Sequence, residues 1–287
     1  MKISLVLPTR GRPMFMKKTW ESAYKTAKNK HNLEICFRID EDDDDSISMY
    51  NKLQLRYHYQ IKAFIGKRGD GILSQFWNEA VSIATGEILH HCGDDLRFRT
   101  DGWDTLVINE FKKYEDKIAL VYGDDGIRRD DLATHGFIHK NWVNVVGYFL
   151  PPYFSSDWND YWLTDVARRV GRLNKIDIYT EHLHPSVGKH DWDKTHQERM
   201  ERGSRDKVSK MYREKQNERN ADAQTLKDFI SSVENSGLEK SLNNFTKNVV
   251  EIKNDNLNLV IERKNKEVRL ELKRKKKKIK RRKIRKK

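Results

Sequence analysis

The sequence predicts an α/β fold in which a mostly parallel sheet is flanked by helices on both faces. Two observations favour this class. Short apolar runs alternate with longer amphipathic stretches over residues 2–124, and glycines and acidic residues follow most of the apolar runs. Such alternation is typical of parallel sheets, because parallel neighbours are joined by helical crossovers.

The expected elements follow in order along the chain. Each expected strand is an apolar run that ends at, or just before, a glycine, a proline or an acidic residue. Each expected helix is a longer stretch with apolar residues spaced along one face. The expected strands are residues 2–8, 33–40, 60–66, 87–92 and 118–124. The expected helices are residues 16–29, 47–58, 71–84 and 103–114.

The positive charge of the chain is concentrated at its end. The 287 residues include 57 Lys and Arg against 43 Asp and Glu, a net charge of +14. Residues 273–287 hold 13 of the basic residues and no acid, so residues 1–272 carry 44 basic and 43 acidic residues. This balance argues against a nucleic-acid-binding fold built from the body, which usually has its own basic excess.

The composition changes near residue 195. All seven tryptophans lie at or before Trp192, and all five prolines lie at or before Pro185. We therefore expect a globular domain over residues 1–195, a charged helical extension over 196–272 and a disordered basic tail over 273–287.

The sequences of the extension and of the tail each indicate a binding partner or a packing contact. The tail suits nucleic acid, an anionic membrane or a polyanionic partner protein. Five apolar residues of the extension recur at steps of four and three, which predicts a short coiled coil, and so a homo-oligomer through residues 238–252, or a helix packed on the body. They are Leu238, Leu242, Phe245, Val249 and Ile252.

We expect a soluble, cytoplasmic protein, in the host cytoplasm if the chain is viral. The apolar run at residues 3–7 is too short for a signal peptide or a membrane span. Cys36 and Cys92 both lie in strand-like runs and match no metal-binding spacing, as expected for reduced core residues.

Charged side chains follow the predicted strands, at the edge where open α/β sheets bind ligands. Asp94 and Asp95 are the sharpest case, because burying a bare carboxylate costs several kcal/mol unless it is paired or binds a metal. Carboxylates suit a divalent cation, and Lys67 with Arg68 suits a diphosphate, so a metal-bridged nucleotide diphosphate fits the set. The turns concerned are residues 8–12, 40–45, 66–71, 93–95 and 123–126.

Three segments, LVLPTRGRP, FRIDEDD and WNEAVSIATGEILHHCGDDLRF, resemble in this order the nucleotide-sugar-binding half of GT-A-fold glycosyltransferases, particularly the inverting family 2 and its bacteriophage-type members. The resemblance continues through RTDGWD, VYGDDG, DWNDYWLTDVARRVGRL and IYTEHLHPSVGK, and it covers residues 1–195. It implies transfer of a sugar from a nucleotide-diphosphate donor, by family tendency a UDP-sugar, to an acceptor hydroxyl with inversion. The implied cofactor is Mn²⁺ or Mg²⁺.

The resemblance also implies roles for individual residues. In the family an Asp-X-Asp motif after a strand holds the metal. Here Gly93 replaces the first acid. Asp95 is then left as the metal ligand, and Asp94 would contact either the ribose or the groups that bind the metal. Asn78 would face the diphosphate or the ribose, although a polar residue on an amphipathic helix is an equal alternative. The other implied donor contacts are Pro8, Thr9 and Arg10 along the base, and Asp40 or Asp42 on the base N–H.

His182 and His184 are further metal candidates. They are two residues apart, so in a strand they would point to the same face. In the resembling families a histidine at this late position completes the coordination of the metal. The alternative is a pair of ordinary core or surface histidines.

The resemblance places the general base at the start of a late helix. Asp160 is the best match, and Asp157 is the competitor. Either could instead be a helix N-cap, a role that is compatible with catalysis because a helix N-terminus keeps a carboxylate ionised.

Two other functions share part of this pattern. A nucleotidyltransferase of similar fold would use the same strand-end acids to transfer a nucleotide instead of a sugar. A non-enzymatic nucleic-acid-binding protein would use the tail at 273–287 and keep the body as a scaffold.

Overall fold

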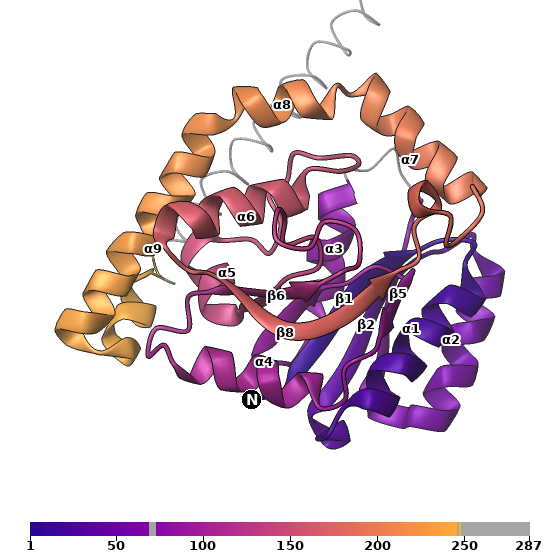
Figure 1. Cartoon of the computed structure of the whole chain (residues 1–287), viewed down its shortest axis with the longest axis horizontal. Coiled ribbons are helices and arrows are strands. Elements are labelled where there is room, and N and C mark those ends of the chain that lie inside the picture. Colours follow the sequence, from indigo (N-terminus) through magenta and orange to yellow (C-terminus); the bar gives the residue numbers. More distant parts are fainter. Residues whose placement is uncertain (69–72, 246, 248–287) are drawn as a thin grey trace, which may run out of the picture.

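A computed structural model of the chain describes residues 1–68, 73–245 and 247 (Figure 1). The sheet of the described residues has eight strands in the order β3-β2-β1-β4-β7-β6-β8-β5. The strands are β1 Ile3–Thr9, β2 Leu33–Asp40, β3 Ile61–Gly66, β4 Ile88–His91, β5 Leu96–Phe98, β6 Leu120–Asp124, β7 Phe137–His139 and β8 Leu173–His182. The helices are α1 Pro13–Thr26, α2 Asp44–Tyr57, α3 Leu73–Ser82, α4 Trp103–Lys112, α5 Lys140–Val146, α6 Asn159–Val170, α7 Lys194–Arg205, α8 Val208–Glu214 and α9 Gln216–Ser236, with short 3-10 turns η1 Lys30–Asn32, η2 His58–Gln60 and η3 Pro185–Val187.

The first half of the sheet is the parallel α/β arrangement that the sequence predicts. β1 pairs in parallel with β2 and with β4, and β2 pairs in parallel with β3. The carboxyl ends of these four strands therefore lie at one edge of the sheet. The turns that the sequence analysis singled out after the strands meet there.

The second half of the sheet is mixed. β7 is antiparallel to both β4 and β6, β6 is parallel to β8, and β5 is antiparallel to β8. The sequence does not predict β7, because three residues are too few to show a period. Since β4 and β6 both run opposite to β7, their carboxyl ends still lie at the same edge.

Helices cover both faces of the sheet, as predicted. One apolar core lies under α1, α2 and α4 and contains Trp20 and Trp103. A second core lies under α3, α5, α6 and α9 and contains Trp142 and Trp162. All four indole side chains are almost fully buried.

The acidic run after β2 is partly a helix start. α2 begins at Asp44, earlier than the sequence predicts, because the side chain of Asp43 accepts a hydrogen bond from the backbone N–H of Ser46 and caps the helix. Asp44 and Asp45 lie in the first turn, where the helix dipole favours negative charge. These three acids thus have a local structural role.

The extension packs on the body over the part that the structure describes. Figure 1 shows α7, α8 and α9 running around the outside of α6. Phe229 of α9 is buried in the same core as Trp162, and the rings of Phe229 and Phe245 lie 5.2 Å apart. Leu238, Leu242 and Phe245 all contact this core.

The heptad residues of this region are therefore used within the chain as far as they are described, which matches the predicted helix on the body. Val249, Ile252 and the tail 273–287 lie outside the described residues. The division of the chain at residue 195 stays a prediction.

One simpler expectation also has a structural counterpart. Cys36 and Cys92 are buried free thiols. Across the described ranges, no helix is long and apolar enough to cross a lipid bilayer.

Candidate functional site

A cavity of about 640 Å³ lies at the carboxyl edge of the sheet. Its volume is within the range of small-molecule sites, which is roughly 300–1,000 Å³. Eleven of the fourteen site residues predicted from the sequence line it: Pro8, Thr9, Arg10, Asp40, Arg68, Asp94, Asp95, Asp157, Asp160, His182 and His184. The strand-end turns therefore converge on one site.

The turn after β1 brings Arg10 against the two acids predicted to receive the base. Its guanidinium donates to Asp40 at 2.8 Å and to Asp42 at 2.5 and 3.0 Å. Asp42 lies in a smaller neighbouring hollow, and its hydrogen bonds with Arg10 hold its pKa below the ordinary value. Asp40 remains at the cavity and is also paired with Arg38. Of the two acids, Asp40 is the one placed to meet a ligand.

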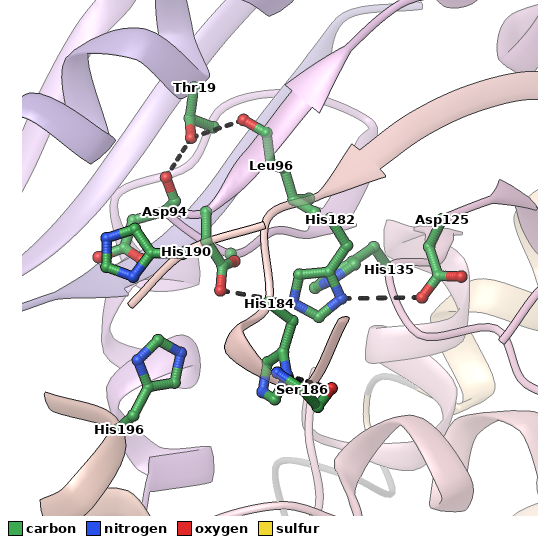
Figure 2. A network of polar contacts seen from close by, with 12 residues as sticks. Thr19, Asp94, Leu96, Asp125, His135, His182, His184, Ser186, His190 and His196 are labelled. Carbon is green, nitrogen blue, oxygen red and sulfur yellow. Dashed lines mark hydrogen bonds and ion pairs between the residues drawn. The ribbon is translucent and has the colours of Figure 1, made fainter. Parts of the chain in front are cut away.

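Asp94 is held by the protein itself. The hydroxyl of Thr9 donates to its carboxylate at 2.8 Å, and Arg12 donates at 3.1 Å. Thr19 donates to the backbone oxygen of Asp94, as Figure 2 shows. Burial raises the pKa of Asp94 to about 6, against the opposing effect of Arg12.

Asp95 faces His182, which ends β8. The Oδ2 atom of Asp95 lies 3.4 Å from Nε2 of His182, and Nδ1 of the same ring lies 3.7 Å from Oδ2 of Asp125. Figure 2 shows the imidazole turned toward Asp125, with His135 beside it. Burial alone would lower the pKa of His182, but the two carboxylates raise it to about 9.

The prediction that His182 and His184 lie on one face of a strand is wrong, because β8 ends at His182. His184 instead caps η3, where its Nδ1 accepts a hydrogen bond from the backbone N–H of Ser186. Its ring still lies 5.3 Å from that of His182, between centroids, and its Nε2 lies 3.5 Å from a guanidinium nitrogen of Arg199. Both histidines therefore line the cavity, His182 from the end of β8 and His184 from the start of η3.

Asn78, Lys67 and Asp42 are not among the described residues that line the cavity. The amide oxygen of Asn78 accepts from the backbone N–H groups of Phe149 and Leu150, and its nitrogen donates to the Leu150 carbonyl at 2.8 Å. Both ends of this amide are therefore used to hold a loop. The predicted contact of Asn78 with the donor is corrected to this structural role.

Comparison with known proteins indicates a family. Residues 4–141 match the sequence profile of Glycosyl transferase family 2. This segment, just under half of the chain, resembles a family 2 glycosyltransferase domain. The matched residues include most of β1, β2, β4 and the turn that carries Asp94 and Asp95, whereas Asp160 and His182 lie beyond the match.

Solved glycosyltransferase structures share the fold of this chain. TarS of S. aureus is 13% identical with a TM-score of 0.50, and the alignment covers 64% of this chain and 37% of TarS. The mannosyltransferase PcManGT of Pyrobaculum calidifontis, solved with GDP-Man and Mn²⁺, is 15% identical with a TM-score of 0.51, covering 67% and 59%. The chain thus spans less than two thirds of either protein. No curated protein sequence matches it.

The two candidate bases differ in environment. Asp160 lies in the first turn of α6, where its Oδ1 accepts from the backbone N–H of Tyr161 at 2.9 Å, and burial raises its pKa to about 7. Asp157 is exposed and paired with Arg199. The N-cap position of α6 is held by Trp158, so neither acid is the N-cap.

Sequence reasoning missed the arginines of α7. Arg199 and Arg202 line the cavity, and the Nε of Arg199 is buried without a hydrogen-bond partner among the described residues. Arg202 donates to the Ser155 carbonyl and forms no ion pair with a carboxylate in the described part of the chain. Both lie in a polar helix outside every motif, which is why no sequence signal pointed to them.

The donor atoms around Asp95 fit a divalent cation. Two ligand atoms that each lie about 2.1 Å from one ion are roughly 3–3.4 Å apart, close to the separation of Asp95 Oδ2 and His182 Nε2. A carboxylate oxygen and an imidazole nitrogen are suitable ligands for Mn²⁺. The residues present therefore fit the cofactor that the resemblance implies.

A second group of ligands lies nearby. His190, Asp193 and His196 place ligand atoms within 4.8 Å of one another. Figure 2 shows the two histidines of this group. The guanidinium of Arg12 donates to Asp193 at 2.7 and 2.8 Å and contacts Nδ1 of His196. Because the guanidinium of Arg12 already pairs with Asp193 and contacts His196, Asp95 and His182 are the stronger candidates for metal ligands.

Proposed function

We propose that this chain is a glycosyltransferase that moves a sugar from a nucleoside-diphosphate donor to an acceptor hydroxyl with inversion, using a divalent cation held by Asp95 and His182. The observation that carries the proposal is the pairing of these two residues at 3.4 Å in a cavity lined by the turns after the parallel strands. The donor we expect first is a UDP-sugar. A GDP-sugar is the second choice, because PcManGT was solved with GDP-Man.

We assign the two parts of the donor, the base and the diphosphate, to different residues of the cavity. Pro8, Thr9 and Arg10 line the side that we assign to the base, with Asp40 held in place by Arg10. We assign the diphosphate to the side lined by Arg199 and Arg202, whose guanidinium groups match phosphate geometry. Bound Mn²⁺ or Mg²⁺ would neutralise the charge that develops on the leaving diphosphate.

Asp160 is suited to take the proton of the acceptor. A general base works best when its pKa is near the operating pH, and burial brings that of Asp160 to about 7. The acceptor oxygen bonds to the anomeric carbon as the bond from that carbon to the diphosphate oxygen breaks. The electron pair leaves with the diphosphate, and the hydroxyl proton passes to Asp160.

The acceptor is proposed only as a class. A tail with 13 basic residues over positions 273–287 would recruit a polyanion, which can be nucleic acid, an anionic membrane or a polyanionic protein. The cytoplasm remains the predicted location, and a bacteriophage-type relationship remains a prediction.

Product analysis tests the proposal. The full chain is incubated with Mn²⁺ and each of a panel of UDP- and GDP-sugars, and the products are separated. Release of free nucleoside diphosphate together with a free or transferred sugar is expected for one donor class. Transfer of the nucleotide, with the sugar phosphate released, would instead identify a nucleotidyltransferase.

A further inference from the structure

Asp125 uses its two carboxylate oxygens differently. It follows β6, and its Oδ1 accepts hydrogen bonds from the backbone N–H groups of Ile127, Arg128 and Arg129 at 2.8, 2.6 and 3.3 Å. Its Oδ2 is buried and has no hydrogen-bond partner in the described part of the chain. Oδ2 lies 3.7 Å from Nδ1 of His182.

The backbone holds this carboxylate in one orientation. Turning the carboxylate away from the loop would break three hydrogen bonds that the backbone N–H groups donate to it. Oδ2 is therefore fixed toward His182. The Nδ1 of His182 is likewise buried without a hydrogen-bond partner among the described residues, so the two unpartnered atoms face each other.

We propose that Asp125 is a positioning residue for the metal. Its Oδ2 accepts a hydrogen bond from Nδ1–H of His182, so that Nε2 carries no proton on the side that faces Asp95. Only an unprotonated nitrogen can bind a cation, and the partner of the other nitrogen decides which one is free. The inference rests on the proposed role of His182 as a metal ligand.

The chain offers a matched control in the neighbouring acid. Asp124 precedes Asp125 in the same turn, and its Oδ1 accepts from the backbone N–H of Gly126 at 2.6 Å. It does not line the cavity among the described residues. An Asp124→Asn variant therefore changes the charge at almost the same place without touching His182.

The informative variant is Asp125→Asn. Its single amide oxygen is required by the three backbone N–H groups, so its NH₂ group turns toward Nδ1 of His182. That donor forces the proton onto Nε2, the nitrogen meant for the metal. We expect Mn²⁺ binding, followed by the spectrum of free Mn²⁺ in electron paramagnetic resonance, to weaken roughly 10–100-fold. Asp124→Asn should bind Mn²⁺ like the unchanged protein.

Nitrogen-15 NMR of the Mg²⁺-loaded protein shows which ring nitrogen of His182 carries the proton. A purely structural role of Asp125 would not change that nitrogen. The unchanged protein should carry its proton on Nδ1, and Asp125→Asn should carry it on Nε2. His182→Gln identifies the signals and should itself weaken Mn²⁺ binding. A proton on Nε2 in the unchanged protein would overturn the inference, even if the Asn variant failed to fold.

The outcomes separate this inference from the proposed function. If Asp125→Asn binds Mn²⁺ normally while His182→Gln does not, Asp125 has no positioning role and the metal site stands. If His182→Gln and Asp95→Asn both bind Mn²⁺ normally, the metal site itself is wrong.

Discussion

Asp95 and His182 approach within 3.4 Å although one follows β4 and the other ends β8, on the far side of two intervening strands. The sheet order brings them together, because β4, β6 and β8 all run in the same direction and end at one edge. The turn that holds Asp94 and Asp95 is tied to β8 by a hydrogen bond from the backbone N–H of Leu183 to the Asp95 carbonyl at 2.9 Å.

The two adjacent acids should respond differently to loss of charge. Asp95→Asn removes a proposed metal ligand, so we expect metal-dependent donor hydrolysis and Mn²⁺ binding to be lost. Asp94→Asn leaves the buried Arg12 with Asp193 as its remaining carboxylate partner, so we expect the free energy of unfolding to fall by roughly 1–3 kcal/mol. Thermal melts and Mn²⁺ titrations of both variants check this; equal metal affinity in the two would contradict it.

Gly93→Ala should weaken metal binding by crowding Asp95. A Cβ atom at position 93 would lie 2.6 Å from Oδ1 of Asp95 and 3.4 Å from a carbon of His135. The carboxylate must then move, and we expect about tenfold weaker Mn²⁺ binding, the order seen when a ligand loses its support. Calorimetric titration measures the affinity, and an unchanged value would show that Asp95 can shift without cost to the site.

The sequence alone predicts much of this turn but little of what surrounds it in the fold. The strand ends predicted the positions of Asp94 and Asp95, and Gly93 was visible as a departure from the family motif. That a side chain at 93 would meet Asp95 depends on a distance that no sequence pattern contains.

The residues that sequence analysis missed share a physical reason. Arg199 and Arg202 enter the cavity because α7 crosses the strand ends, tied there by ion pairs of Arg68 with Glu198 and of Arg12 with Asp193. Asp125 was noted as a strand-end acid, but its role depends on β8 lying next to β6. Contacts between segments this far apart in sequence leave no local signal.

Asp160→Asn should separate binding from transfer. The amide keeps the size of the side chain but removes its basicity, so donor affinity should hold while the transfer rate falls by about 10² to 10⁴. Asp157→Asn is the matched control, because that acid is exposed and already paired with Arg199. Rates and donor affinities of both variants decide the assignment. A loss confined to Asp157→Asn would move the base by three residues.

The pH dependence follows from the raised pKa of Asp160. The carboxyl is protonated below pH 7 and cannot accept a proton, so transfer should rise through pH 7 and then level off. The folded state also binds this proton more tightly than the unfolded chain, whose pKa is about 4. Its contribution to stability is therefore present at low pH and lost as the pH rises through 7. Asp160→Asn should lose less stability than the unchanged protein between pH 5 and 8.

The arginines of α7 should contribute to diphosphate binding. We expect Arg202→Gln to weaken the binding of UDP or GDP roughly tenfold, as removal of one hydrogen bond to a charged group would. Arg213→Gln on α8 is the control, since that side chain is exposed and away from the cavity. Nucleotide titrations test it, and equal affinities in the two variants would remove Arg202 from the donor site.

Deletion of residues 273–287 should leave donor hydrolysis nearly unchanged and weaken binding to anionic polymers or vesicles. The tail supplies almost all of the net charge and none of the strand-end groups. Salt titrations of polynucleotide and vesicle binding, with and without the tail, show which polyanion it prefers. A large loss of hydrolysis in the truncated protein would instead place the tail at the site.

The position of the metal is tested most directly by an anomalous difference map from crystals of the full chain grown with Mn²⁺ and UDP or GDP. We expect a Mn²⁺ peak about 2.2 Å from both Asp95 Oδ2 and His182 Nε2, in contact with the diphosphate. A peak among His190, Asp193 and His196, or a bound diphosphate with no peak beside Asp95, would contradict it.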